Sequence, residues 1–478
     1  MKRRVLPLAV LGATSEAIYL FSFTLPFSLP GHYELLTDMG LLTKYNPAAF
    51  AAFIASVLGL FLLYLLALRE IRENESRHTW AVVVAFALLF VLTMALMYPI
   101  TAIDVYGYIV RTRIFTMFGS NPFTTVPAQF PQDPFGYYIG GWKDWPTPYG
   151  PLFILLATIP SWLSGNDLLL NLLSFKAVAI AAYLWDAWLI FLILKRSHPS
   201  LATRGVLLFA WNPLVVFETA GNGHNDALLV FFVLLAVYLV STDRPTLGMA
   251  ALIASVLIKY ITLLLVPLLA IHILRKQNSW RDRFAFIGLS TVASLALVVP
   301  AYAPFWEGLS TLRGFLGQAD IFISSVPSII TYLLQKWVGL DQADFVAKAL
   351  TGVAFLAIYL WRARSVVADL SSLVLASFDV LFYYLIIACT QFESWYLIWP
   401  IALAALTASS TAHERIHLLA IGAMLGVAVL GYVWPWTGAE FLIVNVMAVS
   451  ALFAPLAGLE AYRRLWRRSP APTPPGPG

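Results

Sequence analysis

Apolar runs of about 20 residues recur along the whole chain, and they limit its fold more than any other feature. An α-helix of that length is what is needed to cross the hydrocarbon core of a bilayer. Hydrophobic residues make up 60% of the sequence and charged residues only 12%, about half the charged fraction of soluble domains. A soluble enzyme, a secreted disulfide scaffold and a disordered chain are therefore excluded. The sequence predicts an all-α, polytopic transmembrane protein.

Hydropathy and length together predict about 12 full spans plus re-entrant or half-helices. The predicted spans cover residues 5–27, 46–68, 79–99, 169–194, 201–220, 226–242, 283–303, 344–361, 366–389, 392–408, 416–433 and 440–460. Three further apolar segments, 149–164, 246–273 and 327–340, do not fit one ordinary crossing. We expect them to be broken or half-helices, with the bend of the second near Lys259. Such breaks are tolerated only where they line protein or a cavity, so they indicate a site.

The basic residues orient the spans. A signal peptide is the alternative for the N-terminus, but its apolar stretch continues past Thr24 without a clear cleavage site, so we interpret it as a retained first span. Cytoplasmic loops are enriched in Lys and Arg, and such residues cluster before the first span and again at 69–77. The long, aromatic-rich loop 100–148 is then external. The excess of basic residues that gives the net charge of +5 gathers near the ends of the predicted spans. It therefore does not indicate nucleic-acid binding.

Asp104 follows the third predicted span and lies a few residues beyond the outer boundary of the membrane, between aromatic residues that include Tyr106. One interpretation is a helix N-cap, because an aspartate before a helix accepts backbone N–H bonds. The functional interpretation is a general base held at the interface. The two interpretations are compatible.

Further along the same loop, Lys143 and Asp144 lie between tryptophans, and Tyr149 belongs to a Pro-Tyr-Gly-Pro motif that would start the next half-helix. The cluster is also typical of an aromatic belt at headgroup level. At the start of a later span, Trp395 and Tyr396 form a similar aromatic group. A belt again explains most of it, although such rings also bind sugars.

A second polar island covers residues 211–229 and includes Glu218, His224, Asn225 and Asp226. A carboxylate at membrane depth is a functional candidate by default. The alternative is a polar turn in which Asn225 or Asp226 caps the returning helix. Polar residues are more concentrated here than capping alone requires.

Cations inside apolar runs need a partner or a cavity. Lys259 lies at the expected helix break, which favours a functional site, and a phosphate would be one partner for it. Lys176 and Asp186 share one span, where snorkelling or an ion pair explains the lysine. Arg313, in the predicted external loop 304–326, faces either a phosphate or lipid headgroups.

Several common motifs are missing from the sequence. It contains no phosphate-binding P-loop, no dinucleotide fingerprint and no pairs of cysteine and histidine at zinc spacing. We therefore expect no bound metal and no cofactor.

The order of these motifs resembles the GT-C superfamily of integral-membrane glycosyltransferases. The resemblance rests on Asp104-Val-Tyr-x-Tyr, Asn121-Pro-Phe, Pro148-Tyr-Gly-Pro, Gly223-His-Asn-Asp, Lys259 and Trp395-Tyr-Leu-Ile-Trp. Within the superfamily, the chain is most similar to bacterial α-mannosyltransferases that use polyprenyl-phosphate mannose. The likeness covers residues 79–410. It divides the chain into two accessory spans (1–78), a catalytic module (79–410), C-terminal spans (411–462) and a basic, then Pro-rich, disordered tail (463–478).

The resemblance implies an inverting transfer of a sugar, expected to be mannose, from polyprenyl phosphate to a glycan or glycolipid acceptor outside the bacterial plasma membrane. Asp104 would be the base. Glu218 and the His-Asn-Asp residues 224–226 would bind sugar hydroxyls, and Lys259 with Arg313 would neutralise the departing phosphate. An apolar groove would hold the polyprenyl chain. The rival hypothesis is a lipid-linked sugar flippase or secondary transporter, which would also use broken helices and charges in the membrane.

Overall fold

The computed structural model describes residues 2–71 and 76–467, and these residues form helices without a sheet. The predicted all-α class is confirmed. Among the described residues, nine helices or continuous helix pairs are long and apolar enough to cross a membrane. They are α1–η1 (Lys2–Ile18, Tyr19–Thr24), α4 (Pro47–Glu70), α5 (Arg77–Ala95), α8 (Leu168–Ser197), α14 (Trp280–Tyr302), α17 (Leu340–Ser365), α18–η8 (Leu370–Tyr383, Tyr384–Ala388), α20–η10–α21 (Ser410–Ala428, Val429–Val433, Trp434–Thr437) and α22 (Phe441–Arg467).

The described residues show nine or ten of the 12 predicted spans. The segment predicted as 201–220 is bent by 53° between η4–α9 (Pro199–Leu201, Ala202–Ala210) and α10–η5 (Pro213–Val216, Phe217–Gly221), and it makes a tenth span only if this pair is one crossing. The other two are shorter helices, α11 (Asp226–Ser241) and η9–α19 (Ser394–Leu397, Ile398–Ala405). Both are largely buried inside the bundle, where α11 packs against α8, α12 (Pro245–Val256) and α19.

The three predicted half-helices are short in the structure as well. They are α7 (Pro151–Ser164), the broken segment α12–η6–α13 (Pro245–Val256, Tyr260–Leu265, Val266–Lys276) and α16 (Val326–Val338). The break of the second falls at the predicted residue, because Lys259 has the extended backbone angles φ −151 and ψ 122. Of the predicted tail, the basic residues as far as Arg467 belong to α22, and the Pro-rich part lies outside the described residues.

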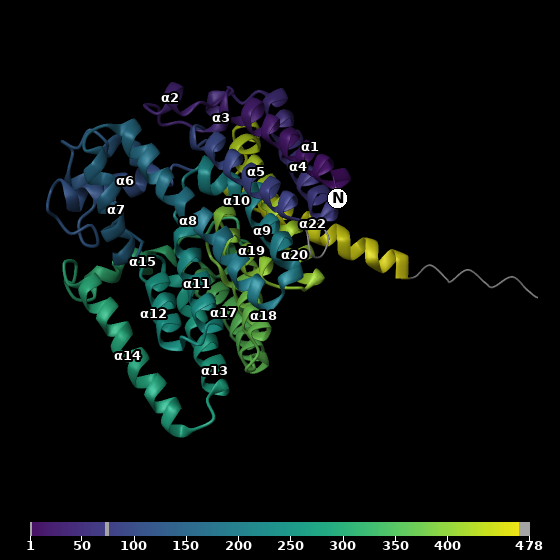
Figure 1. Cartoon of the computed structure of the whole chain (residues 1–478). Coiled ribbons are helices and arrows are strands. Elements are labelled where there is room, and N and C mark those ends of the chain that lie inside the picture. Colours follow the sequence, from purple (N-terminus) through teal and green to yellow (C-terminus); the bar gives the residue numbers. More distant parts are fainter. Residues whose placement is uncertain (1, 72–75, 468–478) are drawn as a thin grey trace, which may run out of the picture.

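The connections at one end of the bundle carry short helices (Figure 1). They are α2 (Leu29–His32), α3 (Met39–Leu42), α6 (Asp104–Thr116), η2 (Pro127–Gln129), η3 (Gly136–Trp142), η7 (Ser310–Leu312) and α15 (Arg313–Gln318). The turn between α13 and α14 (residues 277–279) lies at the opposite end, and it is flanked by Arg275, Lys276 and Arg281.

A buried lysine fixes the path from α5 to α6. Lys176 on α8 is fully buried, and its ammonium donates to the backbone carbonyls of Ala95, at 3.1 Å, and Met97. These carbonyls follow the end of α5, where the helix dipole is negative and favours a cation. The partner of Lys176 is therefore a helix end, and neither snorkelling nor an ion pair with Asp186 explains it. The contact anchors the chain seven residues before Asp104.

The Pro-Tyr-Gly-Pro motif docks onto the broken end of α12. Pro151 is the first residue of α7, as predicted, and the amide of Gly150 donates to the carbonyl of Ile258 at 2.9 Å. A Cβ at position 150 would lie 2.1 Å from the carbonyl oxygen of Leu257. The glycine is therefore needed for the close approach of two backbones just beside Lys259.

Replacing Gly150 with alanine should destabilise the protein by about 1–3 kcal/mol, the usual cost of overpacking. The unfolding temperature of the purified variant in detergent would measure this. Gly141→Ala is the matched control, because a Cβ there has open space around it. Equal unfolding temperatures for the two variants would contradict the assignment of this backbone contact.

Candidate active site

A cavity of about 870 Å³ lies where α6, the start of α7, the break before η6 and the turn before η9 meet. Its charged lining residues are Asp38, Asp104, Arg111, Lys259 and Glu393. Aromatic residues make up much of the rest: Trp142, Tyr149, Tyr260, Phe315, Tyr359, Tyr384, Trp395, Tyr396 and Trp399. The cavity thus joins segments that are nearly 300 residues apart in the sequence. A mixture of carboxylates, cations and flat rings suits a charged ligand that also carries a sugar.

Asp104 is the first residue of α6, and the helix cap is Ile103. The N-cap interpretation of Asp104 is therefore wrong. Its carboxylate lines the cavity, where Oδ1 accepts a hydrogen bond from the Tyr149 hydroxyl at 3.3 Å. Within the described residues this is its single hydrogen bond, so the second carboxylate oxygen is available to a ligand. One fixed and one available oxygen is a suitable arrangement for a base that must be oriented.

Lys259 is paired with Asp226 across the break. Its ammonium lies 2.9 and 3.0 Å from the two carboxylate oxygens, and the indole of Trp399 donates to Oδ1 of Asp226 at 2.6 Å. Asp226 is completely buried, whereas the side chain of Lys259 is 15% exposed and reaches the cavity wall. The charge of Lys259 is thus balanced by the protein before any ligand binds.

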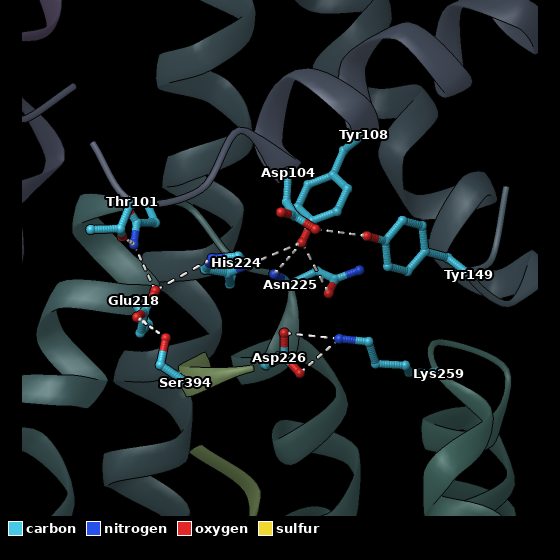
Figure 2. A network of polar contacts seen from close by, with 11 residues as sticks. Thr101, Asp104, Tyr108, Tyr149, Glu218, His224, Asn225, Asp226, Lys259 and Ser394 are labelled. Atoms are coloured by element: carbon cyan, nitrogen blue, oxygen red, sulfur yellow. Dashed lines mark hydrogen bonds and ion pairs between the residues drawn. The ribbon is translucent and has the colours of Figure 1, made fainter. Parts of the chain in front are cut away.

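Glu218 and His224 form a buried layer of polar contacts (Figure 2) and lie outside the cavity lining. Glu218 lies in the π-helical turn η5, a deviation that often occurs at functional sites. Its carboxylate accepts from Asn222 and Ser394, each at 2.6 Å, and lies 3.4 Å from Nε2 of His224. Tyr108 lies on the other side of this layer, and its hydroxyl is 3.4 Å from Nδ1 of His224.

The aromatic residues predicted from the late motif do line the cavity. Trp395 and Tyr396 both belong to the lining, and the ring of Trp395 stacks on His224 with centroids 3.9 Å apart. The ring of Tyr396 lies 4.8 Å from the ammonium of Lys259. The buried network of Glu218 and His224 therefore holds the ring that the cavity presents.

Eight of the predicted substrate-binding residues lie outside the cavity lining. Glu218, His224, Asn225 and Asp226 are buried directly behind it. The Tyr106 hydroxyl donates instead to the carbonyl of Tyr33 at 2.9 Å, which ties α6 to the loop after the first span. Lys143, Asp144 and Arg313 are exposed. Their spacing in the sequence could not show on which side of the loops they would lie.

Metal ligands are absent from this arrangement as far as the chain is described. Among those residues, no group of three histidine, cysteine, aspartate or glutamate side chains is placed to hold a metal ion.

Comparison with known proteins identifies the family to which the chain belongs. The family model described as "Alpha-(1->6)-mannopyranosyltransferase, N-terminal domain" matches residues 9–275, which is more than half of the chain. The chain belongs to the alpha-(1->6)-mannopyranosyltransferase family. The match contains Asp104, Tyr149, the second polar island and Lys259, and it ends before Trp395.

Two relatives named alpha-(1->6)-mannopyranosyltransferase A share about a quarter of their aligned residues with the chain. The chain is 23% identical to alpha-(1->6)-mannopyranosyltransferase A of Mycobacterium tuberculosis over 343 residues, which are 67% of this chain and 64% of that protein. It is 24% identical to alpha-(1->6)-mannopyranosyltransferase A of Corynebacterium glutamicum over 171 residues, 35% of this chain and 34% of that protein. The chain thus matches less than two thirds of the length of these relatives.

Three charged residues of the cavity, Asp38, Arg111 and Glu393, were not among the predicted site residues of this mannopyranosyltransferase family member. Arg111 lies on α6, within the segment 100–148, where its sequence context is ordinary. Glu393 precedes Trp395 in the aromatic motif, and its carboxylate accepts from the amide of Gln391 at 2.8 Å. A carboxylate between two apolar segments was the signal that could have identified Glu393.

Burial raises the pKa of Glu393 to about 8, and the negative charges of Asp104 and Glu218 add to the rise, whereas the hydrogen bond from Gln391 opposes it. The ordinary value is 4.5. Between these values the folded state binds more protons than the unfolded state, so stability should fall as the pH rises, by about 1.4 kcal/mol per unit.

The loss should be complete near pH 8, and below the ordinary value no slope should remain. Glu393→Gln should remove the slope, which unfolding measurements between about pH 5 and pH 9 would show. Parallel curves for the wild type and the variant would contradict the assigned pKa.

Proposed function

We propose that the protein transfers a mannosyl group from polyprenyl phosphate to a hydroxyl group of a mannan-type glycan or glycolipid, forming an α-1,6 linkage. Family membership supports the sugar and the linkage. The observation that carries the proposal is the cavity, which brings a free carboxylate oxygen of Asp104 together with cations and sugar-sized aromatic faces.

The proposed reaction is a single displacement. Asp104 takes the proton of the acceptor hydroxyl, and the acceptor oxygen attacks the anomeric carbon of a β-linked mannosyl donor. The bond from that carbon to the phosphate oxygen breaks, and the electron pair leaves with polyprenyl phosphate. Inversion at the anomeric carbon then gives the α product. The hydrogen bond from Tyr149 holds the carboxylate in one orientation throughout, which supports the role of Asp104.

An apolar arm of the cavity supports a lipid donor. Ile261, Leu263 and Leu264 of η6 line it, together with Phe315 and Tyr359. Leu263 is also 57% exposed on the surface of the bundle, so the arm reaches the apolar surface that lipid would cover. A polyprenyl chain can therefore lie partly between helices and partly in the bilayer.

For the residues behind the cavity we propose positioning roles in place of direct contact with the sugar. Glu218 and His224 hold the ring of Trp395, and Asp226 holds Lys259. We also propose that the reaction takes place on the external face of a bacterial plasma membrane. The basic turn between α13 and α14 lies at the far end of the bundle from α6 (Figure 1), as the preference of cytoplasmic loops for Lys and Arg requires.

The experiment is a transfer assay with the purified full-length protein in lipid vesicles, radiolabelled polyprenyl-phosphate mannose and an α-1,6-mannooligosaccharide acceptor. We expect a labelled product that an α-1,6-mannosidase digests. Movement of the intact donor across the vesicle membrane without a new glycosidic bond would overturn the proposal and favour the flippase. A labelled product resistant to the mannosidase would retain the transferase and reject the linkage.

A further inference from the structure

Arg111 is a buried cation without a partner in the cavity wall. It lies on α6, is only 6% exposed and belongs to the cavity lining. Throughout residues 2–71 and 76–467 it makes no hydrogen bond or ion pair, and its Nε atom is buried without an acceptor. A guanidinium remains charged in proteins and offers five donors. Leaving such a group unpaired is costly, and an anionic ligand would remove the cost.

The other cations near the cavity do not have this property. Lys259 is paired with Asp226 at 2.9 Å. Arg113, only two residues from Arg111, is paired with Asp133 at 3.0 Å and donates to the carbonyl of Gly165. Arg313 is exposed and lies outside the cavity lining. Of the described residues that line the cavity, Arg111 is thus the one cation whose charge no carboxylate balances within ion-pair distance.

Arg111 and Asp104 lie on one face of α6. They are seven residues apart, two helical turns, which is roughly 10 Å along the axis. Gly107 lies between them and also lines the cavity. The guanidinium folds back toward Asp104, because its Nη1 atom is 2.8 Å from the point that a Cβ of residue 107 would occupy. This direction is the usual one for long side chains on a helix.

The placement of both side chains in the lining of one cavity suits an inverting displacement. The base and the leaving group lie on opposite sides of the anomeric carbon.

We infer that Arg111 binds the phosphate oxygens of the polyprenyl-phosphate donor and of the polyprenyl phosphate that leaves. The inference rests on the proposed function and replaces the role predicted for Lys259 and Arg313. The planar guanidinium matches phosphate with two parallel hydrogen bonds. The donor is a phosphodiester and the product a phosphomonoester, so negative charge at the phosphate grows during the reaction. Arg111 therefore favours the transition state over the bound donor.

The test compares two probes, polyprenyl phosphate and the uncharged polyprenol of the same chain length. Their binding to the full-length protein is measured in detergent by ligand-induced stabilisation, and their inhibition of transfer is measured in the same preparation. The wild type should prefer polyprenyl phosphate. In Arg111→Met this preference should fall by at least about tenfold and kcat/KM for transfer by about 10–10²-fold, the range expected when charged hydrogen bonds are lost.

Three variants separate phosphate binding from folding. Arg111→Lys keeps the charge but not the paired hydrogen bonds, so its preference should be intermediate. Gly107→Ala keeps the arginine but displaces the flexible end of its side chain, so it should fold normally and also bind polyprenyl phosphate less tightly. Arg364→Met, at an exposed arginine outside the cavity lining, is the matched control and should behave as the wild type.

The outcomes distinguish this inference from the proposed function. If the wild type makes no glycosidic bond, the proposed function fails, whereas the binding comparison still tests Arg111. If the wild type transfers mannose while folded Arg111→Met and Gly107→Ala keep the full preference for polyprenyl phosphate, the inference is overturned. Should Arg111→Met not fold, Arg111→Lys and Gly107→Ala decide the question by the same binding ratio.

Discussion

Asp104→Asn should lower the rate of mannosyl transfer by at least about 10²-fold, the usual contribution of a general base. Asparagine has the size of aspartate, and its amide oxygen still accepts from the Tyr149 hydroxyl, now 3.3 Å from the carboxylate. The substitution thus removes basicity and leaves the position of the side chain nearly unchanged. Initial rates at saturating donor, measured in vesicles, would give the effect on kcat.

The control is Asp320→Asn, which removes an exposed carboxylate that pairs with Lys348 outside the cavity lining. It should transfer mannose at the wild-type rate. Stabilisation by polyprenyl phosphate should be equal in both variants, which shows that the donor site is intact. Wild-type turnover by Asp104→Asn would remove Asp104 from the role of base.

Lys259→Met should lower the free energy of unfolding by about 3–5 kcal/mol, because it leaves a buried carboxylate without its cation. The carboxylate of Asp226 is fully buried, and its remaining described partner is the indole of Trp399 at 2.6 Å. One hydrogen bond does not compensate a buried charge. Denaturation of the purified variant in mixed micelles would measure the loss.

A double-mutant cycle separates this role from phosphate binding. Lys259→Met combined with Asp226→Asn leaves two neutral side chains and should recover most of the lost stability. If Lys259 served the phosphate instead, the single variant would lose activity and keep its stability. Additive losses in the cycle would show that the pair is not coupled.

Local sequence was sufficient for most of the helices. Nine predicted spans and the break at Lys259 depend on length, hydropathy and nearby charge, and each of these is a property of a short segment. The segments 226–242 and 392–408, predicted as full spans, form shorter helices in the structure. A helix buried in protein is apolar on all sides, as is a helix in lipid. Hydropathy cannot distinguish these two surroundings.

The candidate site was predictable in part. Asp104, Tyr149, Lys259, Trp395 and Tyr396 line one cavity, although they come from four distant segments. Which charges pair could not be predicted, because pairing depends on contacts far apart in the sequence.

Arg111 and Arg113 illustrate this limit. They are two residues apart on one helix, yet only the second meets a carboxylate. The available signal for Arg111 was its spacing of seven residues from Asp104, which places both on one helical face.

The loop between α1 and α4 has a further consequence. Leu36, Thr37, Asp38 and Leu41 line the cavity, so the first two spans, predicted to be accessory, contribute to the same chamber as Asp104. In the proposed reaction, these four residues are separate from α6, the helix that carries the base Asp104 and the phosphate-binding Arg111. We therefore expect substitutions at these four residues to change which acceptor binds, and to leave the bond-making residues in place.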